Sequence, residues 1–175
     1  MVNAFLRAVD KHVVCESTNL GGTKYAKHIV NVEASEDIDN GKLVNLTDAK
    51  YVKNEYFTMV EPTASCRVGL ILSVAIGPDE QPRIATLESN FYNGKGEIMR
   101  VYDLMELDRF TISANGITAL ADAPQVGNFV KADGYDIVEV AEKPEGVGFV
   151  GEIIERISRS GGVFYKILVH RNLEV

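Results

Sequence analysis

Apolar and β-branched residues recur along the chain in short runs separated by glycine, proline and asparagine corners. Two such runs lie on either side of a polar corner within residues 98–113, where Met105 to Asp108 forms a loop. Runs of this kind are typical of strands because β-branched and aromatic side chains suit a pleated, half-buried surface. We therefore expect two strands joined by a corner in this segment.

The longest almost continuous apolar run extends from Val68 to Ile76 and ends before Pro78. A strand with apolar residues on both faces is expected to be buried on both sides. We therefore expect this run to form a central strand of the core. It is about half as long as a membrane-spanning helix, so insertion into a membrane is not expected.

Tight-turn signals define two hairpins in the last third of the chain. The dipeptide Asp133-Gly134 separates residues 128–132 from residues 135–140, and it is a strong two-residue hairpin signal. A second candidate turn, Arg159 to Gly162, separates residues 149–158 from residues 163–169.

Further strand candidates are residues 11–16, 27–32, 42–46 and 84–87. Helix signals are scarce by comparison. Strands at regular spacing with glycine, proline and asparagine corners predict a mostly β fold, an antiparallel barrel or sandwich with short hairpins and little helix.

The chain has 175 residues, which is long enough for one compact domain with a sizeable core. Residues 1–12 are interpreted as an N-terminal arm, and residues 13–175 as a compact β domain, with a division near residues 93–97 into two small β subdomains left open. The arm carries Phe5, Leu6 and Val9, but charged residues interrupt its apolar positions, so no export signal is expected. Packing on its own domain and ordering on a neighbouring subunit are equally open for this arm.

Net charge and cysteine content each argue against one class of protein. The formal net charge is -7, and a surplus of carboxylates argues against a nucleic-acid-binding surface. Cys15 and Cys66 are too few for a disulfide scaffold, so we expect two reduced, buried thiols.

The segment from Gly146 to Gly151 reads GVGFVG, the glycine spacing of a dinucleotide-binding loop. Such a loop needs a following helix within a βαβ unit, and residues 152–158 are too short to provide it. We expect glycines that let a β-loop approach a neighbouring backbone instead, and we predict no cofactor.

Candidate metal ligands or thiol nucleophiles are His12, Cys15, His28 and Cys66. Their spacing matches no zinc motif. Residues three apart in a strand face opposite sides, so His12 and Cys15 are expected to point apart. Neither a metal nor a catalytic residue is predicted.

Acidic residues cluster after the second strand candidate, at Glu33, Glu36, Asp37 and Asp39. Their spacing is not that of a calcium loop, so this segment is interpreted as a solvated loop. It also supports an alternative function, a small β enzyme or carbohydrate-binding module whose cleft is lined by Tyr51, Tyr56, Tyr92 and the acidic loop.

Several segments together resemble the C-terminal part of tailed-bacteriophage head proteins that are encoded beside the major capsid protein. These segments are residues 98–113, the Asn115-Gly116 turn, residues 126–130, Gly134-Tyr135, residues 149–154 and residues 165–169. The segment Asp39 to Val44 is similar to the N-terminal portion of these proteins. Where those relatives often carry Gly-Asp before the F-[ST]-[VI]-[ST] strand, this chain has Leu107-Asp108-Arg109.

The resemblance implies a capsid-decoration or head-stabilising (cement) protein. Such a protein is a non-enzymatic structural component of the virion that binds the major capsid protein on the capsid exterior. It would be made in the cytoplasm of the bacterial host, with a homo-oligomer as an open alternative to a monomer. An acidic chain agrees with an outer position, away from packaged DNA. Phe5, Leu6 and Val9 are the candidates for capsid contact.

Overall fold

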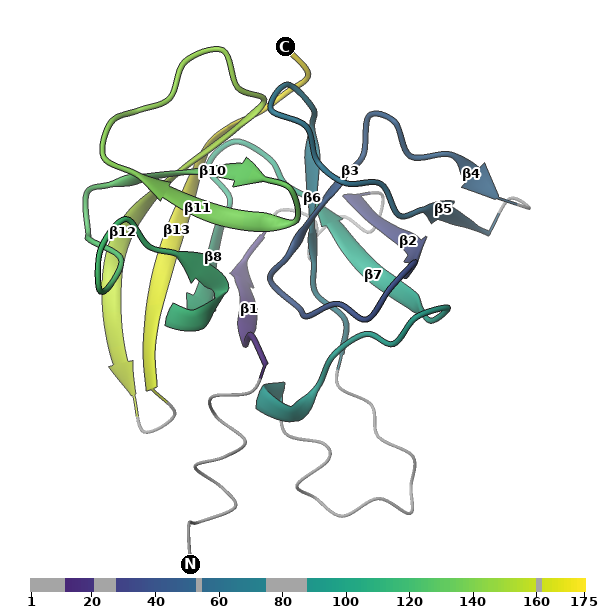
Figure 1. Ribbon diagram of the computed structural model, residues 1–175, viewed down its shortest axis with the longest axis horizontal. Coiled ribbons are helices and arrows are strands. Elements are labelled where there is room, and N and C mark those ends of the chain that lie inside the picture. The colour runs from purple at the N-terminus through teal and green to yellow at the C-terminus, as the bar shows by residue number, and fades with distance from the viewer. Residues whose placement is uncertain (1–11, 21–27, 53–54, 75–87, 160–161) are drawn as a thin grey trace, which may run out of the picture.

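The structure is a computed structural model that describes residues 12–20, 28–52, 55–74, 88–159 and 162–175 (Figure 1). The fold is mostly β, as the sequence predicts, with two curled mixed sheets that form a sandwich or half-barrel. The helical turns of the described residues are two short 3-10 segments, η3 at Glu88–Asn90 and η4 at Ala114–Gly116. No helix in these ranges is long and apolar enough to cross a membrane.

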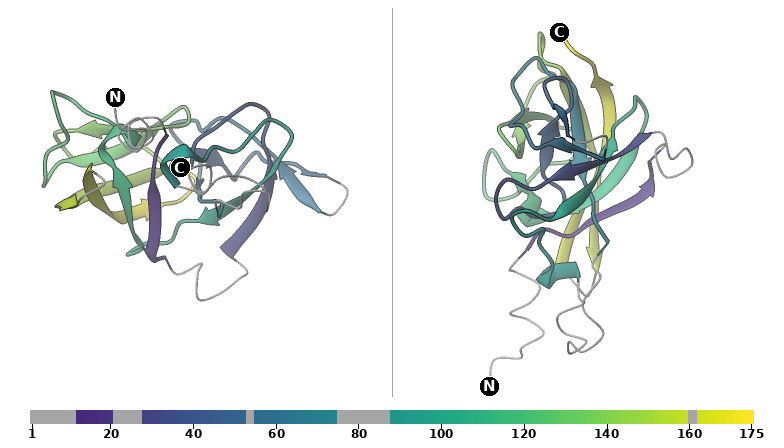
Figure 2. Two further views of the ribbon diagram at one scale, coloured as in Figure 1. Left: turned by 90° about the horizontal axis from the view of Figure 1, so that it is seen from below. Right: turned by 90° about the vertical axis from the view of Figure 1, so that its right-hand side faces the viewer.

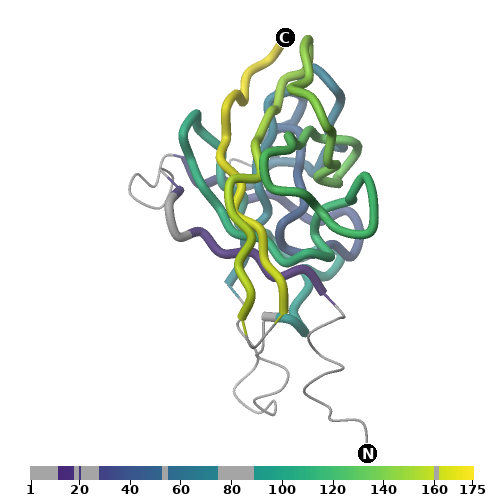
Figure 3. The backbone as a smooth tube through the Cα atoms, turned by 90° about the vertical axis from the view of Figure 1, so that its left-hand side faces the viewer, coloured from purple at the N-terminus to yellow at the C-terminus, as the bar shows by residue number. Residues whose placement is uncertain are grey.

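One sheet has seven strands in the order β1-β8-β13-β12-β10-β11-β9. Their bounds, in chain order, are β1 Cys15–Asn19, β8 Arg109–Ser113, β9 Ile117–Thr118, β10 Phe129–Asp133, β11 Asp136–Val140, β12 Phe149–Arg159 and β13 Gly162–Asn172. Neighbours are antiparallel except for β11 and β9, which are parallel. Figure 3 shows the long β12–β13 hairpin, coloured yellow, crossing one side of the molecule.

The other sheet has six strands in the order β3-β6-β7-β2-β5-β4. Their bounds are β2 Ile29–Glu33, β3 Leu43–Asn45, β4 Tyr51–Val52, β5 Tyr56–Thr58, β6 Val68–Ile71 and β7 Ile98–Asp103. Only β2 and β5 are parallel among these pairs. In the view from below, the blue and teal strands of this sheet lie to one side and the green and yellow strands of the other sheet lie opposite (Figure 2).

Strand β6 contributes to two apolar cores. Leu70 belongs to the core shared by the two sheets, which also contains Phe110 and Ile167 from the seven-stranded sheet. Ile71, the next residue, belongs to a second core on the other face of the six-stranded sheet, together with Met99. Because successive residues of a strand point to opposite faces, both faces of β6 are buried. The expectation of a central, doubly buried strand is confirmed, although β6 ends at Ile71.

Both predicted hairpins are confirmed. Strands β10 and β11 pair around Asp133 and Gly134, and β12 pairs with β13 around the turn that precedes Gly162. The first strand is a correction, because β1 covers Cys15–Asn19 and not residues 11–16. The backbone N–H groups of Val13 and Val14 bond to the side chains of Asp39 and Ser113, at 3.1 and 3.0 Å. The strand candidate at residues 84–87 lies outside the described residues.

The strands predicted within residues 98–113 are confirmed as β7 and β8, but they belong to different sheets. The corner from Leu104 to Asp108 therefore carries the chain from the six-stranded sheet to the seven-stranded sheet. Strand β1 lies in the seven-stranded sheet, far along the chain from its other members. One apolar core joins both sheets over these described ranges.

Candidate functional site

The proposed capsid-contact residues Phe5, Leu6 and Val9 lie outside the described residues. The role assigned to them stays a prediction. The functional surfaces considered below are formed by other parts of the chain.

The predicted metal or thiol candidates each have a different environment. His12 Nδ1 lies 2.7 Å from Asp39 Oδ1, and its ring stacks on Tyr92 at 5.2 Å. Cys15 and Cys66 are both buried in the core. His28 Nδ1 lies 4.0 Å from Asp103 Oδ2. No three His, Cys, Asp or Glu side chains of the described ranges are placed to hold one metal ion.

The GVGFVG segment leads into strand β12 and not into a helix. A Cβ atom at Gly148 would lie 2.1 Å from the carbonyl oxygen of Cys66 and 2.6 Å from that of Leu173. These contacts leave no room for a side chain. The expectation that these glycines allow a close backbone approach is confirmed at Gly148.

An acidic hollow of about 510 Å³ lies between the loop after β2 and the β10–β11 turn. Its charged lining residues are Glu36, Asp37, Asp39, Lys42, Glu61, Asp133 and Asp136. Several of these carboxylates already have partners. Asp37 Oδ1 accepts a hydrogen bond from Lys95 N at 2.9 Å, Asp39 bonds to His12, and Asp136 forms an ion pair with Lys42. The hollow is negatively charged, and part of its acidity stabilises the fold.

Tyr135 is the aromatic residue of this hollow. Burial raises the pKa of its phenol, and the nearby carboxylates of Glu36 and Glu61 raise it further. The phenol therefore stays neutral under ordinary conditions. The three tyrosines predicted to line a cleft lie elsewhere: Tyr51 packs on Phe57 at 4.7 Å, Tyr92 stacks on His12, and Tyr56 is in β5. In the sequence, Tyr135 was noted only within the Gly134-Tyr135 segment of the resemblance, and it was not predicted to line a hollow.

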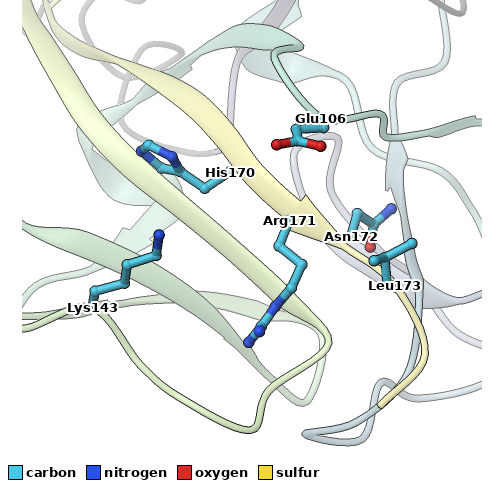
Figure 4. A pocket seen from close by; sticks show the side chains of 6 residues that line it. All are labelled: Glu106, Lys143, His170, Arg171, Asn172 and Leu173. Carbon is cyan, nitrogen blue, oxygen red and sulfur yellow. The ribbon is translucent and has the colours of Figure 1, made fainter.

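A second hollow, of about 260 Å³, lies at the C-terminal end of β13 (Figure 4). It is lined by Glu106, Lys143, His170, Arg171, Asn172 and Leu173. The pairing of β12 with β13 slips here, because Val150 is opposite Arg171 whereas Gly151 is opposite Val169. The extra residue is His170. A bulge of this kind re-aims side chains, and here three consecutive residues of β13, His170, Arg171 and Asn172, line one hollow.

The basic side chains of this second hollow differ in their partners. His170 Nε2 lies 2.6 Å from Glu152 Oε2. Arg171 donates from Nη2 to the carbonyl oxygen of Val147, and its Nε is buried without a hydrogen-bond partner. The ion pairs among the described residues include neither Arg171 nor Lys143. Two positive side chains at this end of the molecule therefore have no carboxylate partner in the described ranges.

The β7–β8 corner lies beside this hollow and contains Leu107, a non-glycine residue with φ of 71°. This left-handed conformation costs a residue with a side chain about 1–2 kcal/mol. Hydrogen bonds hold the corner: Leu107 N donates to Val169 O at 2.9 Å, Val169 N donates to Asp108 O at 2.9 Å, and Met105 N donates to Asp108 Oδ2 at 2.9 Å. The Leu107 side chain is 71% exposed, so burial does not offset the cost.

A scan against protein-family models and searches of curated proteins and of solved structures gave no match to this chain. The surfaces are therefore interpreted from their own geometry and from the sequence.

Proposed function

We propose that this chain is a non-enzymatic structural protein of a bacteriophage virion, which binds the outer surface of the assembled capsid and decorates or stabilises it. One observation above all supports the proposal. The segments that carry the resemblance to phage head proteins include β7 and β8 and parts of β10, β12 and β13 of a single two-sheet framework. The likeness thus extends over the strands and corners of a continuous fold.

The polar chemistry of the described residues agrees with a binding role. His12, His28 and His170 each lie beside a carboxylate. The rings of His12 and His170 lie within hydrogen-bond distance of the carboxylates of Asp39 and Glu152. A histidine base that activates a nucleophile must also contact a serine, threonine or cysteine side chain. The arrangement therefore favours structural pairs over a nucleophilic site.

Charge supports a position outside the capsid. The chain has a net charge of -7, and the acidic hollow concentrates carboxylates on its surface. Such a surface repels packaged DNA, so attachment would depend on protein–protein contacts. A capsid lattice presents many copies of one site, and multivalent contact turns weak single contacts into strong retention.

Co-sedimentation tests this proposal directly. The purified chain would be mixed with capsids assembled from the major capsid protein encoded in the same genome, and an unrelated acidic β protein would serve as control. We expect saturable retention of the chain and none of the control. Retention should fall less steeply with salt than nucleic-acid binding does, because far fewer charges are expected to be paired at the contact. Absence of retention would contradict the proposal and favour the enzyme or carbohydrate-binding alternative.

The same assay tests the N-terminal arm. Deleting residues 1–9 removes Phe5, Leu6 and Val9, whose burial at a contact would contribute a few kcal/mol in total. We expect the shortened chain to stay folded by circular dichroism and to be retained markedly less on capsids. Equal retention of both forms would show that the arm is not the anchor.

A further inference from the structure

Three separate segments meet at one end of the seven-stranded sheet. The second hollow is lined by Glu106 from the β7–β8 corner, Lys143 from the β11–β12 loop, and Arg171 and Leu173 from the end of β13 (Figure 4). The hollow touches all three segments, and Met105 and Leu107, which do not line it, flank Glu106 in the β7–β8 corner. We call this region the end surface, and define it by Met105, Glu106, Leu107, Lys143, Arg171 and Leu173.

Its apolar side chains are presented to solvent by a well-held backbone. Leu107 is 71% exposed, Leu173 is 61% exposed and Met105 is 41% exposed. The corner that carries Leu107 is fixed by its hydrogen bonds to Val169 and within the turn. A large apolar side chain on a preorganised support loses little entropy on binding, as is typical of interface anchors. The Leu107 side chain is mostly exposed, so its burial does not offset the cost of the positive φ.

The polar side chains of the end surface favour one chemical group. Lys143 and Arg171 have no ion-pair partner among the described residues, and the Arg171 guanidinium donates from Nη2 only to the backbone carbonyl oxygen of Val147. Both are donors only, so a carboxylate is their natural complement. Glu106 in the same lining, and Glu145 beside Lys143, oppose the binding of a free anion. A carboxylate carried on a peptide beside an apolar side chain gains apolar contact that offsets this repulsion.

Size agrees with a side chain as the occupant. The hollow has about 260 Å³, below the roughly 300–1,000 Å³ usual for small-molecule pockets. We infer that the end surface is a docking face for a segment of the capsid protein in which a carboxylate lies next to an apolar side chain. The carboxylate binds Lys143 and Arg171, and the apolar side chain packs against Leu107 and Leu173. This inference rests on the proposed function and names the surface and partner chemistry of the attachment.

Two variants test the end surface in the co-sedimentation assay. Leu107→Gly removes the apolar side chain but suits the left-handed backbone, so its melting temperature should not fall. Lys143→Glu reverses one exposed charge. We expect each variant to bind capsids about tenfold more weakly than the wild type. The controls Leu120→Gly and Lys50→Glu change an exposed leucine and an exposed lysine outside the end surface, and should stay within about twofold of the wild type.

A second measurement does not depend on capsids. The Arg171 Nε–H signal can be followed by nuclear magnetic resonance while N-acetyl-Leu-Asp amide is added, with N-acetyl-Leu-Asn amide as the neutral control. We expect a saturable shift with the aspartate peptide only, and its loss in Lys143→Glu. Absence of a shift in the wild type, or equal shifts with both peptides, would overturn carboxylate recognition.

The outcomes separate the two proposals. If the wild type binds capsids and the end-surface variants bind equally well, the docking face is wrong and the proposed function stands. If the wild type is not retained at all, the proposed function is wrong and the end surface is no capsid contact. Reduced retention of both variants with an unchanged melting temperature supports the end surface.

Discussion

The β10–β11 turn and the β7–β8 corner each contain a residue with positive φ. The turn uses glycine, which adopts this conformation readily, whereas the corner uses leucine, which does not. Gly134 has φ of 55°, in keeping with the hairpin signal Asp133-Gly134. Leu107 has φ of 71° and a side chain that is mostly exposed. At Gly134 the residue type suits the backbone conformation. At Leu107 the surrounding hydrogen bonds hold a conformation that the residue type disfavours.

This difference distinguishes a structural corner from a candidate binding corner. Asp108 explains how the fold tolerates Leu107, because its carboxylate accepts the Met105 N–H and its backbone bonds to Val169. These hydrogen bonds fix the backbone of the corner, so Leu107 keeps a positive φ that a leucine residue does not favour on its own. Strain of this kind is concentrated at functional sites.

The largest effect is expected at Gly148, where the fold requires glycine for space. Gly148→Ala would place a Cβ atom 2.1 Å from the backbone oxygen of Cys66. The backbone segments around Gly148 and Cys66 would therefore have to move apart. We expect a loss of at least about 3 kcal/mol in the free energy of unfolding, measured by chemical denaturation. Gly127→Ala is the control, since Gly127 has positive φ but no atom within 4 Å of its Cβ position. A loss at Gly148 no larger than the loss at Gly127 would show that the backbone around Gly148 can move to make room for a side chain.

A smaller loss is expected at Gly134, where glycine serves only the backbone. Gly134→Ala keeps the turn but places a side chain at φ of 55°, and the Glu61 side chain, 2.7 Å from the new Cβ, can move away. We expect a loss of about 1–2 kcal/mol, measured in the same denaturation experiment. No loss would mean that the left-handed conformation has little cost in this fold, which would weaken the interpretation of Leu107.

The hairpins and the central strand could be predicted because their signals are local. Asp133-Gly134 specifies its own turn, and the run that begins at Val68 is apolar on both faces. Sheet membership could not be predicted, since the apolar pattern of residues 98–113 is the same whether β7 and β8 pair or separate. The start of the first strand was misplaced because Val13 and Val14, which precede β1, donate their backbone N–H groups to the side chains of Asp39 and Ser113, which are distant in sequence.

The end surface was beyond prediction for a similar reason. Its hollow depends on a register slip at His170, which appears only when β12 and β13 are paired. Leu107-Asp108-Arg109 was visible in the sequence as a departure from the Gly-Asp turn expected from the proposed likeness to phage head proteins. Its meaning depends on the backbone angle, which no residue pattern encodes.

A slight gain in stability is expected at Leu107 itself. Leu107→Gly relieves the left-handed strain, and the greater freedom of glycine in the unfolded chain offsets part of that relief. We expect a gain of about 0–1 kcal/mol in the free energy of unfolding, opposite in sign to the loss at Gly134. Thermal denaturation of both variants side by side measures this contrast. A clear loss in Leu107→Gly would indicate that the leucine packs in the fold, and would remove the comparison.

The smallest expected effect depends on pH and concerns Asp103, the last residue of β7 before the corner. Burial raises the pKa of its carboxyl above the ordinary value of 3.8, while Arg67 and His28 lower it and Asp108 raises it. Arg67 Nε lies 3.3 Å from Asp103 Oδ1 but not in hydrogen-bond geometry, so it only partly offsets burial.

The sign of the pH effect follows from proton binding. Between pH 3.8 and the raised pKa, the folded chain holds a proton at Asp103 that the unfolded chain has lost, so stability falls as pH rises through this window. Asp103→Asn keeps the shape without the titration. We therefore expect the variant to gain stability relative to the wild type as pH rises from below 3.8 to 7, measured as the difference in denaturation midpoints. If the wild type instead gains stability relative to the variant as pH rises over that range, the attraction between Asp103 and Arg67 outweighs the effect of burial. The ion pair before the corner would then be net stabilising.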